Sequence, residues 1–154
     1  MAALEAAHGV GVVHRDLKPD NIFVDTRAEP WVVTLLDFGI ATHEGPTGSN
    51  LTSPGVVMGT PGFMAPERVR GARAVTPKVD IYAMGVVAWT VLVGHEPFAG
   101  GSAVDVMRHQ LVMAVPPLRP EAPDVPPALE ALINQMLEKD PDRRYPSARA
   151  LAED

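Results

Sequence analysis

Apolar positions in the last third of the chain repeat with the period of an α-helix. Five of them occupy one helical face at i, i+3, i+4, i+7 and i+8: Leu129, Leu132, Ile133, Met136 and Leu137. A proline at position 127 precedes this run, and an Asp-Pro pair stands at 140–141. Because proline suits the first turn of a helix and disrupts its interior, the pattern predicts a helix that begins near residue 127 and stops at residue 140.

A longer apolar run covers residues 81–93 and is interrupted only by Gly85 and Thr90. A helix of this length spans about 20 Å, which is shorter than the roughly 30 Å hydrocarbon core of a bilayer. The run therefore predicts a buried helix of a globular core and no membrane segment in this chain. Thr76 and Pro77 predict its start, as N-cap and first-turn proline.

Two shorter helices carry start signals of their own. Ser102 and Asp105 have the spacing of a capping box and open a helix that extends to about Met113. Ser147 caps a last short helix near the end of the chain. Between these helices, six prolines fall within residues 116–127. This connector can be neither helix nor central strand, and its alternative reading is a ligand of an SH3-type domain.

The first third of the chain alternates short β-prone runs with polar or proline-marked turns. The runs are residues 11–13, 21–24 and 31–36. Residues 37–67 then hold six glycines and four prolines with little periodicity, which predicts a long loop. Such a loop is unusual inside a compact domain unless it is functional. Taken together, the pattern predicts one α+β domain that is mainly helical, with a few short strands near its beginning.

The balance of charges and the absence of cysteine exclude several classes of function. The chain has 13 Lys and Arg residues against 19 Asp and Glu residues, a formal net charge of −6. We expect no nucleic-acid binding, because no basic surface is available to neutralise phosphates. The absence of cysteine excludes a disulfide scaffold, a thiolate zinc site and a cysteine nucleophile. It is typical of the cytoplasm, and we expect no signal peptide, because the start of the sequence lacks a basic region followed by an apolar one.

Three short motifs stand in order along the chain. They are H-R-D-L-K-P-D-N at residues 14–21, D-F-G at 37–39 and A-P-E at 65–67. Each is weak alone, but their order and the glycine-rich loop between the last two make them specific. In these motifs the chain resembles the protein kinase family, and in particular its bacterial, eukaryotic-like (Hanks-type) serine/threonine branch. The resemblance covers the whole chain, residues 1–154, as the C-terminal lobe of a kinase domain with 37–67 as the activation segment.

The resemblance implies roles for four polar residues. Asp16 would orient the substrate hydroxyl and accept its proton, while Lys18 would stabilise charge on the phosphate being transferred. Asn21 and Asp37 offer the oxygen atoms that a hard cation prefers, so they would hold Mg²⁺ or Mn²⁺, and together with Lys18 they would bind ATP. Phosphoryl transfer needs positioning and charge compensation, which these side chains supply. The alternative is that the Asp and Asn residues only form turns.

Further residues match positions on the substrate side of the family. Thr60 and Gly62 lie in the segment that would receive the substrate next to the phosphoacceptor, and Thr60 would hydrogen-bond the catalytic Asp and Lys. Phe63 stands where tyrosine is commoner in the family.

Three residues match the family's structural supports. Asp80 would brace the backbone of the H-R-D turn. Arg144 would pair with Glu67 of A-P-E in a buried ion pair that is costly to break. Arg143 is the alternative partner of Glu67.

Regulation by phosphorylation is implied by Arg15 of the H-R-D motif, which in the family pairs with a phosphate on the activation segment. Candidate acceptors are the small hydroxyl residues of that segment, with the first two preferred: Thr52, Ser53, Thr47 and Ser49. Their alternative role is that of ordinary polar loop residues. Residues 37–67 contain no lysine or arginine, and Thr42 stands where many relatives have a basic residue. We therefore expect Arg15 to receive a phosphate without that helper.

The family's nucleotide-binding N-terminal lobe has no counterpart in these 154 residues. The sequence has no G-x-G-x-x-G loop and no lysine-bearing strand of that lobe, and Met1 falls within the helix that should precede the catalytic loop and end near His8. We therefore expect the isolated chain to bind ATP weakly and to transfer little phosphate.

Three interpretations of function follow. The first is a fragment of an active serine/threonine kinase, with protein substrates and ATP as partners and a kinase dimer as a further expectation. The second is a pseudokinase-like scaffold, which the intact catalytic residues disfavour. The third is an unrelated α-rich domain, which the ordered motifs disfavour. Each kinase interpretation predicts a cytoplasmic location, including that of the cytoplasmic part of a longer membrane-anchored protein.

Overall fold

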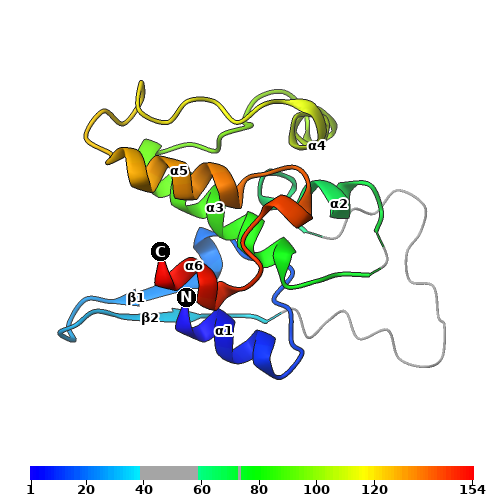
Figure 1. Cartoon of the computed structure of the whole chain (residues 1–154). Helices are drawn as coiled ribbons and strands as arrows, with labels where there is room; N and C mark the ends of the chain where they lie inside the picture. Colours follow the sequence, from blue (N-terminus) through cyan, green and yellow to red (C-terminus); the bar gives the residue numbers. More distant parts are fainter. Residues whose placement is uncertain (39–58, 73) are drawn as a thin grey trace, which may run out of the picture.

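The computed structural model describes residues 1–38, 59–72 and 74–154. Helices predominate in this part of the chain, and two strands form a small sheet at one side (Figure 1). The helices are α1 (Ala2–Gly9), α2 (Pro66–Val69), α3 (Lys78–Val93), α4 (Ala103–Val112), α5 (Pro127–Met136) and α6 (Ala148–Glu153). The strands are β1 (Ile22–Asp25) and β2 (Val32–Leu35), and short 3₁₀ turns are η1 (Pro19–Asn21), η3 (Pro61–Phe63) and η4 (Pro141–Arg143). The expectation of a mainly helical fold with short strands near its beginning is confirmed.

Helix α3 forms the centre of the fold, with α5 beside it (Figure 1). Its side chains are buried around most of its circumference, and Tyr82 and Trp89 are fully buried, as expected of a core helix. Gly85 allows α3 and α5 to approach closely, because a Cβ at this position would lie 2.9 Å from the Cβ of Met136. Among the described residues, no helix is long and apolar enough to cross a membrane.

Strands β1 and β2 form an antiparallel hairpin in which Ile22 pairs with Leu35 and Val24 with Val33. This hairpin leaves most of its large apolar side chains in solvent. Val33 is 56% exposed, and Trp31, which precedes β2, is 67% exposed. The hairpin therefore buries little apolar surface against the rest of the described chain.

Residues 11–13 do not form the predicted strand. Their backbone groups close the end of α1 instead: the Gly11 N–H donates to the His8 carbonyl at 3.0 Å, and the Val12 N–H donates to the Ala7 carbonyl at 2.9 Å. Gly11 has a φ of 76°, the left-handed conformation that commonly ends a helix. The apolar composition of this segment was therefore a misleading signal, because its donors are used by the helix end.

The predicted helix starts are largely correct, and one predicted end is wrong. Ser102 and Asp105 form the expected capping box, and the Ser147 side chain accepts a hydrogen bond from the Ala150 N–H. Helix α3, however, begins after Pro77, and Thr76 supplies only its backbone carbonyl, to Val79.

Helix α5 ends at Met136, and not at residue 140 as predicted. The carbonyls of Glu138 and Lys139 accept hydrogen bonds from the Arg144 guanidinium, at 2.7 and 3.3 Å. Both carbonyls lie beyond the end of α5, so the Arg144 side chain holds the segment that follows this helix.

Candidate active site

The turn at His14 and Arg15 is held in place by Asp80, which lies in the first turn of α3. One oxygen of the buried Asp80 carboxylate accepts the His14 N–H at 2.8 Å, and the other accepts the Arg15 N–H at 2.9 Å. The His8 ring adds a third contact, at 2.8 Å. Arg15 has a φ of 70°, a conformation that non-glycine residues adopt only at a cost of about 1–3 kcal/mol. The carboxylate of Asp80 therefore compensates for a strained turn next to Asp16.

The His14 side chain connects this turn to the end of the hairpin. It is fully buried, and its Nε2 donates to the Leu36 carbonyl at 2.8 Å. Its Nδ1 accepts the Asp16 N–H at 3.4 Å. The Phe38 ring packs against the imidazole with centroids 4.7 Å apart. The segment that carries Asp16 and the segment that carries Asp37 are thereby fixed to each other.

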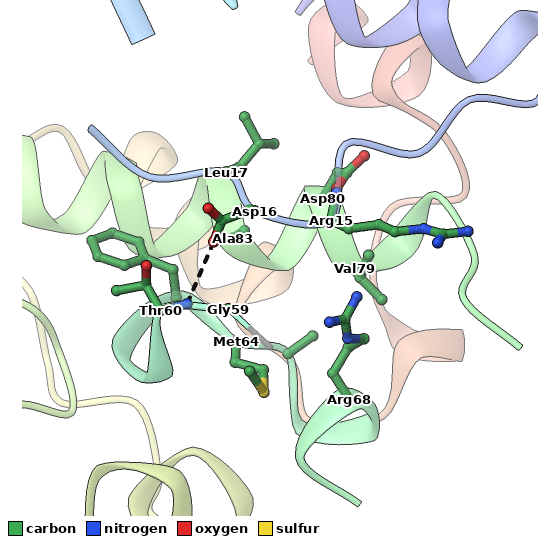
Figure 2. A pocket seen from close by; sticks show the side chains of 12 residues that line it. Arg15, Asp16, Leu17, Gly59, Thr60, Met64, Arg68, Val79, Asp80 and Ala83 are labelled. Atoms are coloured by element: carbon green, nitrogen blue, oxygen red, sulfur yellow. Dashed lines mark hydrogen bonds between the residues drawn. The ribbon is translucent and has the colours of Figure 1, made fainter. Parts of the chain in front are cut away.

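Asp16, Lys18 and Thr60 form one cluster at the surface. The Lys18 ammonium lies 3.2 Å from the Asp16 Oδ2 and donates to the Thr60 hydroxyl at 3.2 Å. The Thr60 N–H donates to the Asp16 Oδ1 at 3.4 Å, the bond that Figure 2 marks with a dashed line. The pocket behind them has a volume of about 10 Å³, room for about one water molecule. Both charged side chains stay partly exposed and accessible to a substrate.

Asn21 and Asp37, the predicted metal ligands, lie next to the same end of the hairpin. Asn21 directly precedes β1, Asp37 follows β2 by two residues, and the Leu36 N–H donates to the Asn21 carbonyl at 2.9 Å. The Asn21 amide nitrogen donates to the Asp16 carbonyl at 2.7 Å. Within the described residues, its Oδ1 atom, the one that suits a hard cation, makes no hydrogen bond. Within the described residues, no group of three or more His, Asp or Glu side chains could hold a metal by itself.

The segment after Thr60 is anchored from helix α4. Gln110, which is fully buried, donates through its side-chain amide to the Gly62 carbonyl and accepts the Tyr82 hydroxyl proton. Burial raises the pKa of Tyr82 well above its usual range. Sequence analysis did not single out Gln110, since a glutamine on a helix carries no motif. The only available signal was its place on the inner face of the predicted helix.

Glu67 is paired with Arg144 and not with Arg143. Two parallel hydrogen bonds of 2.7 and 2.8 Å join the Arg144 guanidinium to the Glu67 carboxylate. The Arg144 side chain is fully buried; its other hydrogen bonds go to backbone carbonyls, including that of Lys78 at 3.1 Å, and its guanidinium lies over the Tyr82 ring. Arg143 instead forms an ion pair with Glu138 at 3.1 Å near the surface.

Arg68 was not anticipated from the sequence. It directly follows Glu67 and lines the same pocket as Arg15 (Figure 2). Burial lowers the pKa of Arg68, and the charge of Arg15 lowers it further, against the opposing charges of Asp80, Asp16 and Glu67. A second cation therefore lies near Arg15, although residues 37–67 contain none. The phosphorylation candidates Thr52, Ser53, Thr47 and Ser49, and Thr42 with them, lie outside the described residues.

Comparisons with known proteins agree with this geometry. The family model described as "Protein kinase domain" matches residues 1–154. The chain is 44% identical to the serine/threonine-protein kinase pkn3 of Myxococcus xanthus, over 97% of this chain and 28% of that protein. It is 36% identical to the serine/threonine-protein kinase PknL of Mycobacterium tuberculosis, over 100% of this chain and 37% of that protein. The chain thus spans well under half of these relatives, and over its whole length it belongs to the protein kinase family.

Proposed function

We propose that this chain is the C-terminal lobe of a serine/threonine protein kinase, which transfers the γ-phosphoryl group of ATP to serine or threonine hydroxyls of proteins. The observation that carries the proposal is the cluster of Asp16, Lys18 and Thr60, with Asn21 bonded to the same loop. A carboxylate, an ammonium group and a hydroxyl within hydrogen-bonding distance of one another suit a reaction that depends on positioning and charge compensation. The names of the relatives support the serine/threonine class.

The surroundings of each site residue favour the role that we propose for it. Asp16 accepts the proton of the attacking hydroxyl, and its orientation is set by the Thr60 N–H and by the loop contacts of Asn21. Lys18 places a positive charge beside Asp16, where charge on the transferring phosphoryl group would be stabilised. Asn21 and Asp37 would hold Mg²⁺ or Mn²⁺ together with ATP phosphates. The bound cation would neutralise phosphate charge, and two protein oxygen ligands suit a metal that shares its other ligands with phosphate and water.

The supporting contacts distinguish this arrangement from a set of turn-forming residues. Asp80 stabilises a strained turn immediately before Asp16, and His14 joins that turn to the end of the hairpin. Polar turn residues on a surface do not need a buried carboxylate to fix them. Thr60 and Gly62 are proposed as the platform for the substrate, and Arg15, with Arg68 nearby, as the receiver of a regulatory phosphate. Protein substrates and ATP are the proposed partners, and the cytoplasm is the proposed location.

The decisive test replaces Asp16 in the whole gene product that contains this chain. Asp16→Asn keeps the shape of the side chain and removes the base, so kcat for phosphorylation of serine and threonine peptides should fall about 10²- to 10⁴-fold. Phosphopeptide formation from ATP in the presence of Mg²⁺ is the measurement. Asp20→Asn, an exposed aspartate of the same loop, is the matched control and should retain activity.

Two outcomes would contradict the proposal. One is a wild-type protein that transfers no phosphate to any serine or threonine peptide at saturating ATP and Mg²⁺; a binding scaffold would then be the better description. The other is an Asp16→Asn variant as active as the wild type. Assaying the 154-residue chain beside the whole gene product shows how much of the activity these residues hold by themselves.

A further inference from the structure

The carboxylate of Glu96 lies directly against the proposed substrate platform. Glu96 is in the turn that follows α3, far from Gly62 in sequence. A Cβ atom placed on Gly62 would overlap both carboxylate oxygens of Glu96 and the carbon between them. The absence of a side chain at position 62 is therefore what gives the Glu96 carboxylate its place. An acidic group occupies the space that a side chain of the platform would otherwise fill.

This carboxylate has no partner within the described part of the chain. Its oxygens make no hydrogen bond and no ion pair there, although the Glu96 backbone carbonyl accepts from Ala99 at 3.4 Å. The neighbouring His95 side chain contacts Glu121 at 2.7 Å and not the Glu96 carboxylate. Partial burial raises the pKa of Glu96, and no positive charge opposes this effect. A partly buried and uncompensated carboxylate favours the approach of a cation.

The platform fixes how far Glu96 lies from the proposed base. The Thr60 N–H is 3.4 Å from the Asp16 carboxylate, and Gly62 is two residues further along the chain. Two residues span at most about 7 Å, so the Glu96 carboxylate lies within about 14 Å of Asp16. An extended peptide covers that distance in about four residues. A peptide whose hydroxyl is at Asp16 can therefore place a nearby side chain at Glu96.

We propose that Glu96 is a specificity determinant of the kinase, which binds a lysine or arginine of the protein substrate within about four residues of the phosphoacceptor. The inference rests on the proposed function and names the class of substrate: basic serine/threonine segments. An arginine is the better match, since its guanidinium can donate two parallel hydrogen bonds to one carboxylate. Gly62 contributes by leaving the carboxylate uncovered, and Gln110 contributes by fixing the Gly62 carbonyl.

The experiment compares peptides in the whole gene product. A serine peptide is prepared in a neutral form and in forms that carry one arginine at each of the four positions before and after the serine. We expect at least one arginine form to exceed the neutral peptide in kcat/KM by about tenfold, the size of one charge-assisted contact. In Glu96→Gln the ratio between these two peptides should approach one. In Glu96→Lys it should reverse, and a glutamate at the same position should then be preferred.

Glu121→Gln is the matched control. It removes an acidic charge of the same region whose partner is His95, and it should keep the preference of the wild type. Melting temperatures of all variants check the fold; because the Glu96 carboxylate has no partner to lose, Glu96→Gln should melt at or above the wild-type temperature. A wild type without preference for arginine at any position overturns the inference, and so does a preference that survives in Glu96→Gln. Absence of phosphorylation of every peptide would instead contradict the proposed function itself.

Discussion

The helices packed around α3, called the helical body below, differ from the β1–β2 hairpin in how much of their large apolar side chains they bury. In the body, apolar side chains such as Trp89 and Val86 are fully buried, and the buried charge of Arg144 is matched by Glu67. In the hairpin, Val33 and Phe23 are more than half exposed, and four residue pairs hold the two strands together. Isolated two-stranded hairpins are marginal in water. The body is stabilised by its own packing, whereas the hairpin depends on its attachment through the His14–Leu36 hydrogen bond and through Ile22 and Leu35, which pack against the core.

The difference matters because the proposed metal ligands belong to the weaker region. Asn21 and Asp37 stand beside one end of the hairpin, while Asp16 and Thr60 are fixed to the body through Asp80 and Gln110. Local opening of the hairpin would separate the metal ligands from the rest of the site without unfolding the body. The substrate side of the site is thus the rigid side. Substitutions in the two regions test this contrast, and the greatest loss of stability is expected where a buried charge loses its partner.

Arg144→Ala should destabilise the body most. It removes a fully buried guanidinium and leaves the Glu67 carboxylate and three backbone carbonyls without their donor. Breaking a buried pair in this way costs about 3–5 kcal/mol of unfolding free energy. Urea unfolding monitored by circular dichroism is the measurement. Arg143→Ala, which removes only a surface pair with Glu138, should cost less than about 1 kcal/mol. Equal losses in the two variants would show that the buried pair contributes no more to stability than the surface pair.

The same substitution made once in each region tests the contrast directly. Val86→Ala removes two methyl groups from a fully buried site in α3 and should lower the free energy of unfolding by about 2–3 kcal/mol. Val33→Ala removes them from a side chain that is 56% exposed and should cost less than about 0.5 kcal/mol. Both values come from the same denaturation experiment. A large loss in Val33→Ala would mean that the hairpin is covered in solution.

Lys139 should make the free energy of unfolding of the helical body depend on pH. Its ammonium lies 3.7 Å from the centre of the Phe98 ring and donates to the Tyr82 hydroxyl at 3.3 Å. Burial lowers the pKa of Lys139 to about 8, from 10.5, and the charges of Arg144 and Arg70 add to the effect. The unfolded chain therefore binds more protons between these two values, and the wild type should become more stable as pH rises through this window.

Lys139→Met removes the titrating group and fits the same apolar surroundings. The difference in unfolding free energy between variant and wild type should change in favour of the wild type between about pH 7 and pH 10. The expected change is about 1–2 kcal/mol, reduced from the full shift because the side chain is partly exposed. Denaturation of both proteins at several pH values measures it. A constant difference over this range would show that Lys139 keeps its ordinary pKa.

Local signals predicted much of the helical body. The capping box at Ser102 and Asp105, the cap at Ser147 and the burial of the 81–93 run depend on neighbouring residues only, and the structure contains all three. The Asp-Pro pair at 140–141 did not predict the end of α5, because the chain leaves the helix at Leu137 and the Glu138 N–H bonds only three residues back, to the Gln135 carbonyl. Residues 11–13 were predicted as a strand because they are apolar. Instead, the backbone N–H groups of Gly11 and Val12 bond to carbonyls at the end of α1.

The residues of the candidate site also include some that the sequence predicted and some that it did not. Asp16, Lys18, Asn21 and Asp37 were predicted because their motifs resemble those of the kinase family, and the structure brings Asp16 and Lys18 into contact with each other and with Thr60. Gln110, Arg68 and Glu96 were missed, since each acts through a residue distant in sequence or through a neighbour without a motif. For Glu96 a signal existed in principle. A glycine at position 62, inside a segment where a side chain would be expected to contact substrate, is a reason to ask what fills its place.

The positions of the two tryptophans give the protein an internal optical readout of this contrast. Trp89 is fully buried in α3, and Trp31 is 67% exposed beside β2. The fluorescence of a buried indole shifts to longer wavelength when water reaches it, so Trp89 reports whether the body is folded. Trp31 is mostly in water already, so its emission should shift to shorter wavelength when another surface covers the hairpin. Without any attached dye, a single emission spectrum thus distinguishes unfolding of the body from the docking of a partner on the hairpin.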